Sequence, residues 1–415
     1  MAKNINKRRI LIYSLVFSPD SVSTAYLYND IALGLKEKGY QITVLTTTPH
    51  YNLIQTNLEN QPLQKQFFGI FYTSIYKGIL VYHIPLKKFK STLLRILSFI
   101  YWHTVSLYLG LLIKKADYIL TPSPPLTSGL VAVLLAKFKS AKCIYNVQEI
   151  YPDLLIKHGR LKNRFIIKLL KILESCVYNW SDAVTTIDLQ FYNVIKQRIK
   201  NQNKLFIIPN FVDTSFYDTK SSDSIPNIFI KQEGYINMVY AGNIGLAQEW
   251  DLVLSLAKEI ENHPITIWII GEGIKKPYLK FNIKKNKIKN IKLLPYQDRR
   301  YMPSINLFAD FHFIIMNKDL ENEGFPSKVY TIMSSGKPIV VVSSKDTPIV
   351  SFLEETNSAL IVKDHSLKGL KDAVLKLSSD KNLREVLGNS GREIIEKKFN
   401  KKTIIDKYIE LIESM

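Results

Sequence analysis

A short stretch around residue 328 combines a cation with turn-forming residues in an order suited to binding an anion. Residues 321–338 read ENEGFPSKVYTIMSSGKP and are followed by the apolar run Ile339–Val342. Pro326 fixes its own φ angle, and we expect Ser327 to cap a helix that begins near Lys328. A helix N-terminus offers unpaired backbone N–H groups, so it suits a phosphate. Because a cation in the first turn opposes the helix dipole, Lys328 predicts a bound anion.

This order of residues resembles the donor-binding segment of retaining nucleotide-sugar glycosyltransferases of family 4, which have the two-domain GT-B fold. It is similar to the bacterial subgroup that builds surface polysaccharides, which includes the colanic-acid-type enzymes. In that subgroup a proline-serine-lysine tripeptide opens the helix, as residues 326–328 do here. The resemblance implies catalytic roles for Glu323 beside the donor sugar and for Lys328 at the leaving diphosphate. It also places Phe325, Pro326 and Ser327 in the donor site.

One position departs from the family pattern. Relatives usually carry a second glutamate eight positions after the first, where it contacts the ribose hydroxyls of the donor. In this chain Thr331 occupies that place. A threonine hydroxyl makes one hydrogen bond to a ribose, and this neutral bond is weaker than the bond of a carboxylate. The sequence therefore predicts a donor site whose ribose contact is reduced to Thr331.

Two glycine turns are the other expected parts of the donor site. Residues 241–245 follow a predicted strand and precede a predicted helix, and residues 271–273 follow the predicted strand 265–270. Many relatives bind the donor phosphates with an arginine and a lysine near the first turn, where this chain has Asn243 and Gln248. The second turn commonly lines the nucleotide base. The resemblance thus assigns the donor site Gly242, Asn243, Gly245, Gln248, Gly271, Gly273 and Tyr296.

The N-terminal half alternates strands and helices in the pattern of a parallel sheet. Residues 8–17 predict a strand, residues 24–38 an amphipathic helix and residues 41–45 the next strand. Ligands bind at the carboxyl ends of such strands, so the loops there are expected to face a cleft. The acceptor-side candidates in these loops are Ser23, Thr24, His50, Tyr51, Glu149 and Asp153.

These acceptor-side candidates have plainer alternatives. Glu149 is the candidate base that takes the proton of the acceptor hydroxyl. A helix cap and a solvated loop explain Glu149 and Asp153 equally well. For His50, a structural or solvated role is the simpler expectation.

The alternating pattern predicts an α/β chain of two doubly wound, Rossmann-like domains that face each other across a cleft. We place an acceptor-binding domain at residues 1–213 and a nucleotide-sugar-binding domain at residues 214–395. A C-terminal helix, residues 396–415, is expected to return to the first domain. With 415 residues, 46% of them hydrophobic, the chain is long enough for two cores. Its two cysteines have apolar neighbours and indicate buried thiols in a reducing compartment.

The net charge of +20 and the segment 86–115 bear on where the chain works. The uncharged run Ile96–Ile113 just reaches the ~20 residues of a spanning helix. A spanning helix would put strands of one sheet on opposite sides of a membrane, so we reject it. Two interpretations remain open, and both can hold for different faces of the segment. In one, a helix packs on the sheet; in the other, a basic and aromatic face with Tyr101 and Trp102 lies on an anionic membrane surface. The flanking basic residues are Lys87, Lys88, Lys90, Arg95, Lys114 and Lys115.

The resemblance implies a retaining glycosyltransferase that uses a nucleoside diphosphate sugar. We expect a UDP-linked donor, with an N-acetylated or deoxy sugar as one option, and a polyprenyl-linked saccharide acceptor in polysaccharide, O-antigen or capsule biosynthesis. The apolar run after the basic start ends in Ser-Pro-Asp, which favours a strand over a signal peptide. We therefore expect a cytoplasmic enzyme, peripheral on the inner face of the cytoplasmic membrane. No Asp-x-Asp occurs in the chain, so we expect no metal and no cofactor.

Two alternatives stay open. The first is an enzyme of the same fold with a soluble acceptor. The second is a basic nucleic-acid-binding α/β protein. No zinc-ligand spacing or RNP-like aromatic motif accompanies the positive charge, so we expect no nucleic-acid partner.

Overall fold

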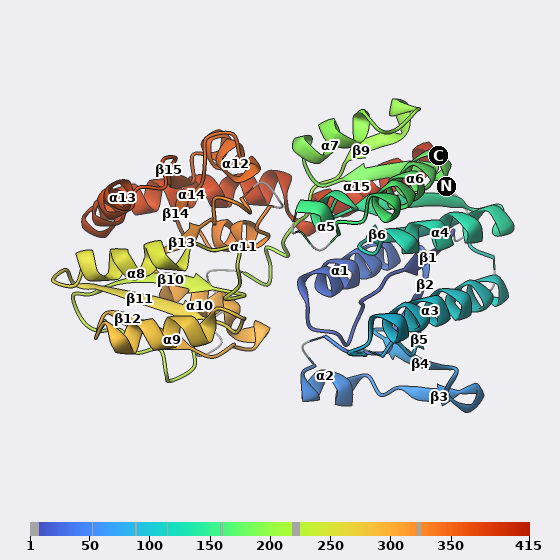
Figure 1. Ribbon diagram of the computed structural model, residues 1–415, viewed down its shortest axis with the longest axis horizontal. Helices are drawn as coiled ribbons and strands as arrows, with labels where there is room; N and C mark the ends of the chain where they lie inside the picture. The colour runs from blue at the N-terminus through green and yellow to red at the C-terminus, as the bar shows by residue number, and fades with distance from the viewer. Residues whose placement is uncertain are drawn as a thin grey trace, which may run out of the picture. The chain divides into compact units, whose positions relative to one another are not determined.

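The computed structural model describes residues 8–51, 53–87, 89–113, 115–157, 159, 161–217, 225–321 and 325–415. The chain divides into two compact units. The first consists of Met1–Asn210 with Lys402–Met415, and the second of Phe211–Lys401. Each unit is built on its own β-sheet flanked by helices (Figure 1). The sequence predicts these divisions at residues 213 and 395.

The sheet of the first unit has nine strands in the order β3-β4-β5-β2-β1-β6-β7-β8-β9. The strands are β1 (Arg9–Tyr13), β2 (Gln41–Thr47), β3 (Gln64–Gln66), β4 (Phe71–Tyr76), β5 (Ile79–Ile84), β6 (Tyr118–Ser123), β7 (Lys142–Val147), β8 (Ala183–Thr186) and β9 (Leu205–Ile207). β4 runs antiparallel to β3 and β5, and the other neighbouring pairs are parallel. The carboxyl ends of the parallel strands therefore lie along one edge of this sheet.

Helices cover the sheet of the first unit. They are α1 (Ser23–Glu37), α2 (Gln55–Asn60), α3 (Thr92–Leu112), α4 (Leu126–Lys139), α5 (Asp153–Lys157), α6 (Arg164–Trp180), α7 (Leu189–Lys196) and α15 (Lys401–Ser414), with the 3₁₀ turns η1 (Phe67–Gly69) and η2 (Gln202–Lys204). α3 packs on α4, and α4 packs on α6. α15 belongs to this unit because Ile405 lies on Gly34 of α1 and the Tyr118 hydroxyl donates to the Ile412 carbonyl at 3.0 Å.

α3 contains most of the uncharged run of the segment 86–115. One of its faces, with Trp102, Ser106, Leu109 and Gly110, is buried against the sheet and α4. The prediction that Trp102 faces a membrane is wrong, because its ring is fully buried and stacks on Tyr13 at 5.2 Å between centroids. None of the helices in the described ranges is both long and apolar enough to cross a bilayer.

The sheet of the second unit has six strands in the order β12-β11-β10-β13-β14-β15, all parallel. The strands are β10 (Ile236–Ala241), β11 (Ile265–Ile270), β12 (Ile291–Leu294), β13 (Phe311–Ile315), β14 (Ile339–Val342) and β15 (Ala359–Val362). The strand order reverses between β10 and β13. In open α/β sheets such a switch point is where ligands bind, at the carboxyl ends of the strands.

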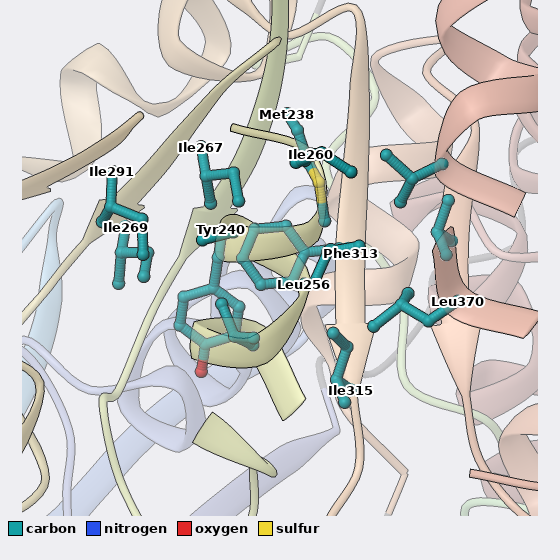
Figure 2. Close-up of a cluster of buried hydrophobic side chains, with 14 of the residues drawn as sticks. Met238, Tyr240, Leu256, Ile260, Ile267, Ile269, Ile291, Phe313, Ile315 and Leu370 are labelled. Carbon is teal, nitrogen blue, oxygen red and sulfur yellow. The ribbon is translucent and has the colours of Figure 1, made fainter. Parts of the chain in front are cut away.

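The helices of the second unit enclose its apolar strands. They are α8 (Trp250–Glu259), α9 (Lys276–Lys285), α10 (Met302–Phe308), α11 (Lys328–Ser334), α12 (Pro348–Thr356), α13 (Leu367–Ser379) and α14 (Lys381–Lys398), with the 3₁₀ turn η3 (Arg299–Tyr301). Met238 and Tyr240 of β10 pack with isoleucines of β11 and β13 and with Leu256 of α8 in the core that Figure 2 shows. Continuous apolar runs such as β14 are what parallel strands covered on both faces require.

Two glycines of α14 hold α11 in place. A β-carbon at Gly388 would lie 2.2 Å from the carbonyl oxygen of Gly336, in the turn that ends α11. At Gly391 it would lie 3.2 Å from the Met333 side chain. α14 therefore contacts the end of α11 at a distance that only glycine allows, and this contact sets the position of the helix that begins at Lys328.

Gly388→Ala tests this contact. Alanine favours a helix interior by about 1 kcal/mol over glycine, but the new methyl group meets a backbone carbonyl that has no rotamer to escape to. We expect the clash to prevail and the free energy of unfolding to fall by about 1–3 kcal/mol, measured by chemical denaturation. Val386→Ala, at an exposed site on the same helix, is the control and should change it by less than about 0.5 kcal/mol. An unchanged or more stable Gly388→Ala protein would contradict the packing argument.

Candidate functional site

The two glycine turns of the second unit interlock through their backbones. Gly271 has a φ of +151°, and a β-carbon there would lie 1.9 Å from the carbonyl oxygen of Gly242. At Gly273, with a φ of +157°, it would lie 2.3 Å from the carbonyl oxygen of Ile244. The Ile244 N–H also donates to the Glu272 carbonyl at 2.8 Å. The turns after β10 and β11 thus form one unit that needs glycine at these places.

The ammonium of Lys328 reaches the first of these turns from the start of α11. Its Nζ lies 3.6 Å from the centroid of the Tyr240 ring, as in a cation–π contact. Nζ is also only 2.6 Å from the place where a β-carbon at Gly242 would stand. A side chain at Gly242 would therefore displace the ammonium, so this glycine and Lys328 depend on each other.

Burial lowers the pKa of Lys328 to about 7. Loss of hydration disfavours the charged form of a lysine, and no carboxylate in the described ranges compensates for it. A partly dehydrated ammonium without a counter-ion is an unfavourable arrangement that an incoming anion would relieve. The site therefore has the electrostatics of an anion-binding site at the switch point of the sheet.

Tyr240 is a functional residue that sequence reasoning missed. Its ring packs against Phe313 at 5.6 Å and its hydroxyl donates to the Asn243 carbonyl at 2.7 Å. Figure 2 shows the ring inside the core, with the hydroxyl directed away from the aliphatic side chains. Tyr240 thus joins the core, the first glycine turn and Lys328. The available signal was one tyrosine near the end of a mostly apolar strand, directly before a glycine turn.

α11 differs in detail from the predicted helix. The prediction that Ser327 caps it is wrong, because Ser327 already has helical angles (φ −56°, ψ −22°) and its side chain makes no capping bond. The Thr331 hydroxyl donates to the Lys328 carbonyl at 2.9 Å, within the helix. The role of Thr331 at a ribose stays a prediction.

The two described residues before Ser327 lead into α11. The Phe325 ring packs on Tyr330 at 5.2 Å and on Phe352 at 5.1 Å, so it fixes the entry to the helix. The Pro326 carbonyl accepts a bond from the Val329 N–H at 3.0 Å. Glu323 lies outside the described residues.

Glu321, which sequence reasoning did not single out, fixes the chain shortly before α11. Its buried carboxylate accepts hydrogen bonds from the Ser343 hydroxyl at 3.0 Å and the Ser344 N–H at 2.8 Å. It also lies 3.0 Å from Nε2 of His365. Burial alone would raise the pKa of Glu321, but these hydrogen bonds outweigh burial and the pKa lies below its usual value. Glu321 thus ties residue 321 to the loops after β14 and β15.

The other predicted donor-site residues occupy different environments. Asn243 is exposed on the first turn, and the Gly245 carbonyl accepts a bond from the Trp250 indole at 2.8 Å. Tyr296 is about half exposed after β12. The Gln248 side chain is buried, and its Oε1 accepts a bond from the Ile315 N–H at 3.2 Å. Gln248 therefore secures the end of β13 and does not project from the surface as a phosphate ligand would.

In the first unit, Asp20 brings the acceptor-side loops after β1 and β2 together. Its Oδ1 accepts bonds from the backbone N–H groups of His50, at 2.8 Å, and of Tyr51, at 2.7 Å. Ser23 and Thr24 form the start of α1 at the end of the same loop. Sequence analysis pointed to this loop but gave no role to Asp20, whose carboxylate joins the loops after β1 and β2.

Glu149 and Asp153 are held in place in different ways. The Glu149 carbonyl accepts a bond from the Ser123 hydroxyl at 3.0 Å, which holds the residue at the carboxyl end of β7. Asp153 forms an ion pair with Arg198, which also pairs with Glu174 at 2.8 Å. The carboxylate of Asp153 thus has a structural partner. The described residues bring together no group of three His, Cys, Asp or Glu side chains that would hold a metal.

Comparisons with known proteins agree with this architecture. A family model described as glycosyl transferases group 1 matches residues 221–394. Over 378 residues the chain is 24% identical to an Escherichia coli (strain K12) protein named as a colanic acid biosynthesis glycosyl transferase, WcaI. That alignment covers 87% of this chain and 90% of WcaI.

Solved structures match over almost the whole chain. Sucrose-phosphate synthase of Thermosynechococcus elongatus has a TM-score of 0.73 at 12% identity and covers 98% of this chain and 99% of its own. Anabaena HepE in complex with UDP has a TM-score of 0.72 at 14% identity, covering 98% of this chain and 100% of its own. The family match includes the glycine turns and Lys328. The fold is therefore GT-B, residues 221–394 form a group 1 glycosyltransferase domain, and the chain is a glycosyltransferase.

Proposed function

We propose that this enzyme transfers a sugar, with retention of anomeric configuration, from a UDP-sugar to a lipid-linked saccharide during polysaccharide assembly. The observation that supports the proposed donor is the ammonium of Lys328, partly dehydrated against the Tyr240 ring and without a carboxylate partner among the described residues. A diphosphate supplies the missing negative charge. The Anabaena HepE complex with UDP supports the choice of nucleotide, and the likeness to WcaI supports the polysaccharide.

In the proposed reaction Lys328 stabilises the departing diphosphate. As the bond between the anomeric carbon and the phosphate oxygen breaks, negative charge grows on that oxygen, next to the fixed ammonium. A preorganised charge in a closed site lowers the barrier because it needs no reorganisation during the reaction. No Asp-x-Asp occurs in the sequence, so we propose that this cation acts without a metal ion.

The acceptor hydroxyl attacks the same face of the sugar that the diphosphate leaves. Glu149 takes the proton of that hydroxyl as the candidate base, and the leaving phosphate oxygen assists the attack on the same face. Glu323 would orient the donor sugar, as the resemblance implies. Asp153 has no proposed part in the chemistry, because its carboxylate is paired with Arg198.

A lipid-linked acceptor places the reaction at a membrane surface. α3 supports this part of the proposal because its outer face is apolar and exposed, with Leu93 at 65% and Leu97 at 51% exposure. The basic residues Lys87, Lys90 and Arg95 lie beside this face and are exposed. An enzyme of the same fold with a soluble acceptor is the second candidate.

A panel of nucleotide sugars tests the donor half of the proposal. We expect UDP-sugars to stabilise the enzyme against thermal unfolding, since a ligand at a hundred times its Kd adds about 2.7 kcal/mol. GDP- and ADP-sugars are the controls for the base. Salt-dependent binding to RNA, without stabilisation by any nucleotide sugar, would overturn the proposal.

Lys328→Ala tests the role of the ammonium. We expect turnover to fall about 10²–10³-fold, because one preorganised contact to the transition state is lost. Folding should persist, since removing a dehydrated charge relieves an unfavourable arrangement. Lys337→Ala, at the other end of α11, is the matched control because burial also lowers the pKa of Lys337. Equal losses in both variants would mean that general positive charge, and not the position of Lys328, matters.

The lowered pKa predicts a pH dependence of donor binding. A bound diphosphate favours the protonated lysine, so it raises the pKa of Lys328 above its value of about 7 in the free enzyme. Affinity for a UDP-sugar is then full below about pH 7 and falls as the pH rises, by up to about tenfold per unit. Isothermal titration calorimetry from about pH 6 to about pH 9 measures this effect. Lys328→Met should bind more weakly and without this slope. A wild-type affinity that is constant or increasing above pH 7 would rule out the assignment.

A further inference from the structure

Two phenylalanines stand on the surface of the first unit in an unusual backbone conformation. Phe67 and Phe68 in η1, between β3 and β4, have φ angles of +41° and +55°, followed by Gly69 at +96°. Phe67 is 72% exposed and Phe68 is 100% exposed. L-residues rarely adopt positive φ, and aromatic rings rarely stand free in water. The unfavourable backbone angles and the exposed rings occur at the same turn, which indicates that the turn contacts a partner.

This turn adjoins the exposed face of α3. The Tyr101 hydroxyl donates to the Ile70 carbonyl at 3.0 Å, so the helix and the turn are joined. The first half of α3 exposes Leu93, Leu94, Ile96, Leu97, Ile100 and Tyr101. Figure 1 shows α3 passing along β5, which agrees with their contacts. The turn and the first half of α3 therefore form one apolar surface.

The sheet topology places this surface near the acceptor-side loops. β4 starts at Phe71, and the next residue, Tyr72, pairs with His83, beside the carboxyl end of β5. The Ile84 carbonyl accepts a bond from the Thr48 N–H at 2.9 Å, where β2 ends. The turn lies at the same edge of the sheet as the loops that Asp20 joins.

The charge of the surrounding chain identifies the kind of partner. Residues 60–148 contain eleven Lys and Arg and one acidic residue, Asp117, so they carry +10, half of the net charge of the chain. The exposed Lys65 lies against the turn, with its Cε 3.0 Å from the place of a β-carbon at Gly69. The exposed cations beside the turn and the first half of α3 are Lys65, Lys87, Lys90 and Arg95, and apolar rings among such cations match an anionic lipid surface.

We propose that the turn 67–70 and the first half of α3 form a docking surface for an anionic phospholipid bilayer. The Phe67 and Phe68 rings enter the interface between headgroups and acyl chains. Lys65, Lys87, Lys90 and Arg95 contact the headgroup phosphates. This inference rests on the proposed lipid-linked acceptor and extends it, because it directs the edge with the acceptor-side loops toward the membrane.

Vesicle sedimentation of the full chain tests the proposal, with vesicles of phosphatidylcholine alone or mixed with phosphatidylglycerol. The double variant Phe67→Ser with Phe68→Ser removes both rings and no charge. Phe165→Ser with Ile166→Ser changes a second exposed apolar face, at the start of α6, where Phe165 is 74% exposed. Ile274→Ser with Phe281→Ser is the matched control in the lysine-rich region around α9, where these side chains are 76% and 63% exposed.

We expect the wild type to bind the anionic vesicles and the variant at residues 67 and 68 to bind them about tenfold or more weakly. The control near α9 should bind as the wild type does. Phe68→Trp should show a blue-shifted emission on adding anionic vesicles. Stabilisation by UDP-sugars should be unchanged in all variants, which separates this test from that of the donor site.

Other outcomes would overturn the docking surface. These are wild-type binding by the variant at residues 67 and 68, equal losses in all three variants, or a loss only in the α6 variant. A wild type that ignores anionic vesicles but is stabilised by UDP-sugars would refute the docking surface and leave the glycosyltransferase assignment intact. Self-association that disappears in the variant at residues 67 and 68 would identify a second copy of the chain as the partner instead.

Discussion

The contact between the Lys328 ammonium and the face of the Tyr240 ring is the interaction on which the donor site depends. A cation stays in such a place only if the surroundings hold it there, because water would hydrate it better. Three parts of the second unit do so. The core fixes the ring, the interlocked glycine turns leave room for the ammonium, and α14 holds the end of α11 through Gly388. The site is thus built mainly from backbone placement, with few polar side chains.

Two carboxylates, one in each unit, hold the loops that follow the strands. Asp20 in the first unit and Glu321 in the second both accept bonds from backbone N–H groups of neighbouring loops. Each lies at the carboxyl edge of its sheet, where strands end and chain direction changes. Such a carboxylate fixes the course of a loop through its backbone N–H groups, so its position matters for the shape of the sheet edge.

The alternation of strands and helices was predictable because apolar residues are spaced differently in strands and in helices. The glycine-turn motif was predictable because it follows a strand. Details that depend on tertiary packing were not. Trp102 was expected at a membrane surface, yet its ring stacks on Tyr13 of the sheet beneath α3. Gln248 was assigned to the donor site, yet its buried side chain accepts a bond from the last N–H group of β13. Tyr240 looked like an ordinary strand residue, since nothing local reveals that a lysine 88 positions later lies on its ring.

The interlocked turns have a consequence for how this enzyme can change. The group that would meet a side chain at Gly271 is the carbonyl of Gly242, and no substitution elsewhere removes a carbonyl. A mutation in one turn therefore has no single compensating mutation in the other. The two loops can change in length or shape only together. Grafting one of these loops between related enzymes would thus require both turns to be moved as a pair.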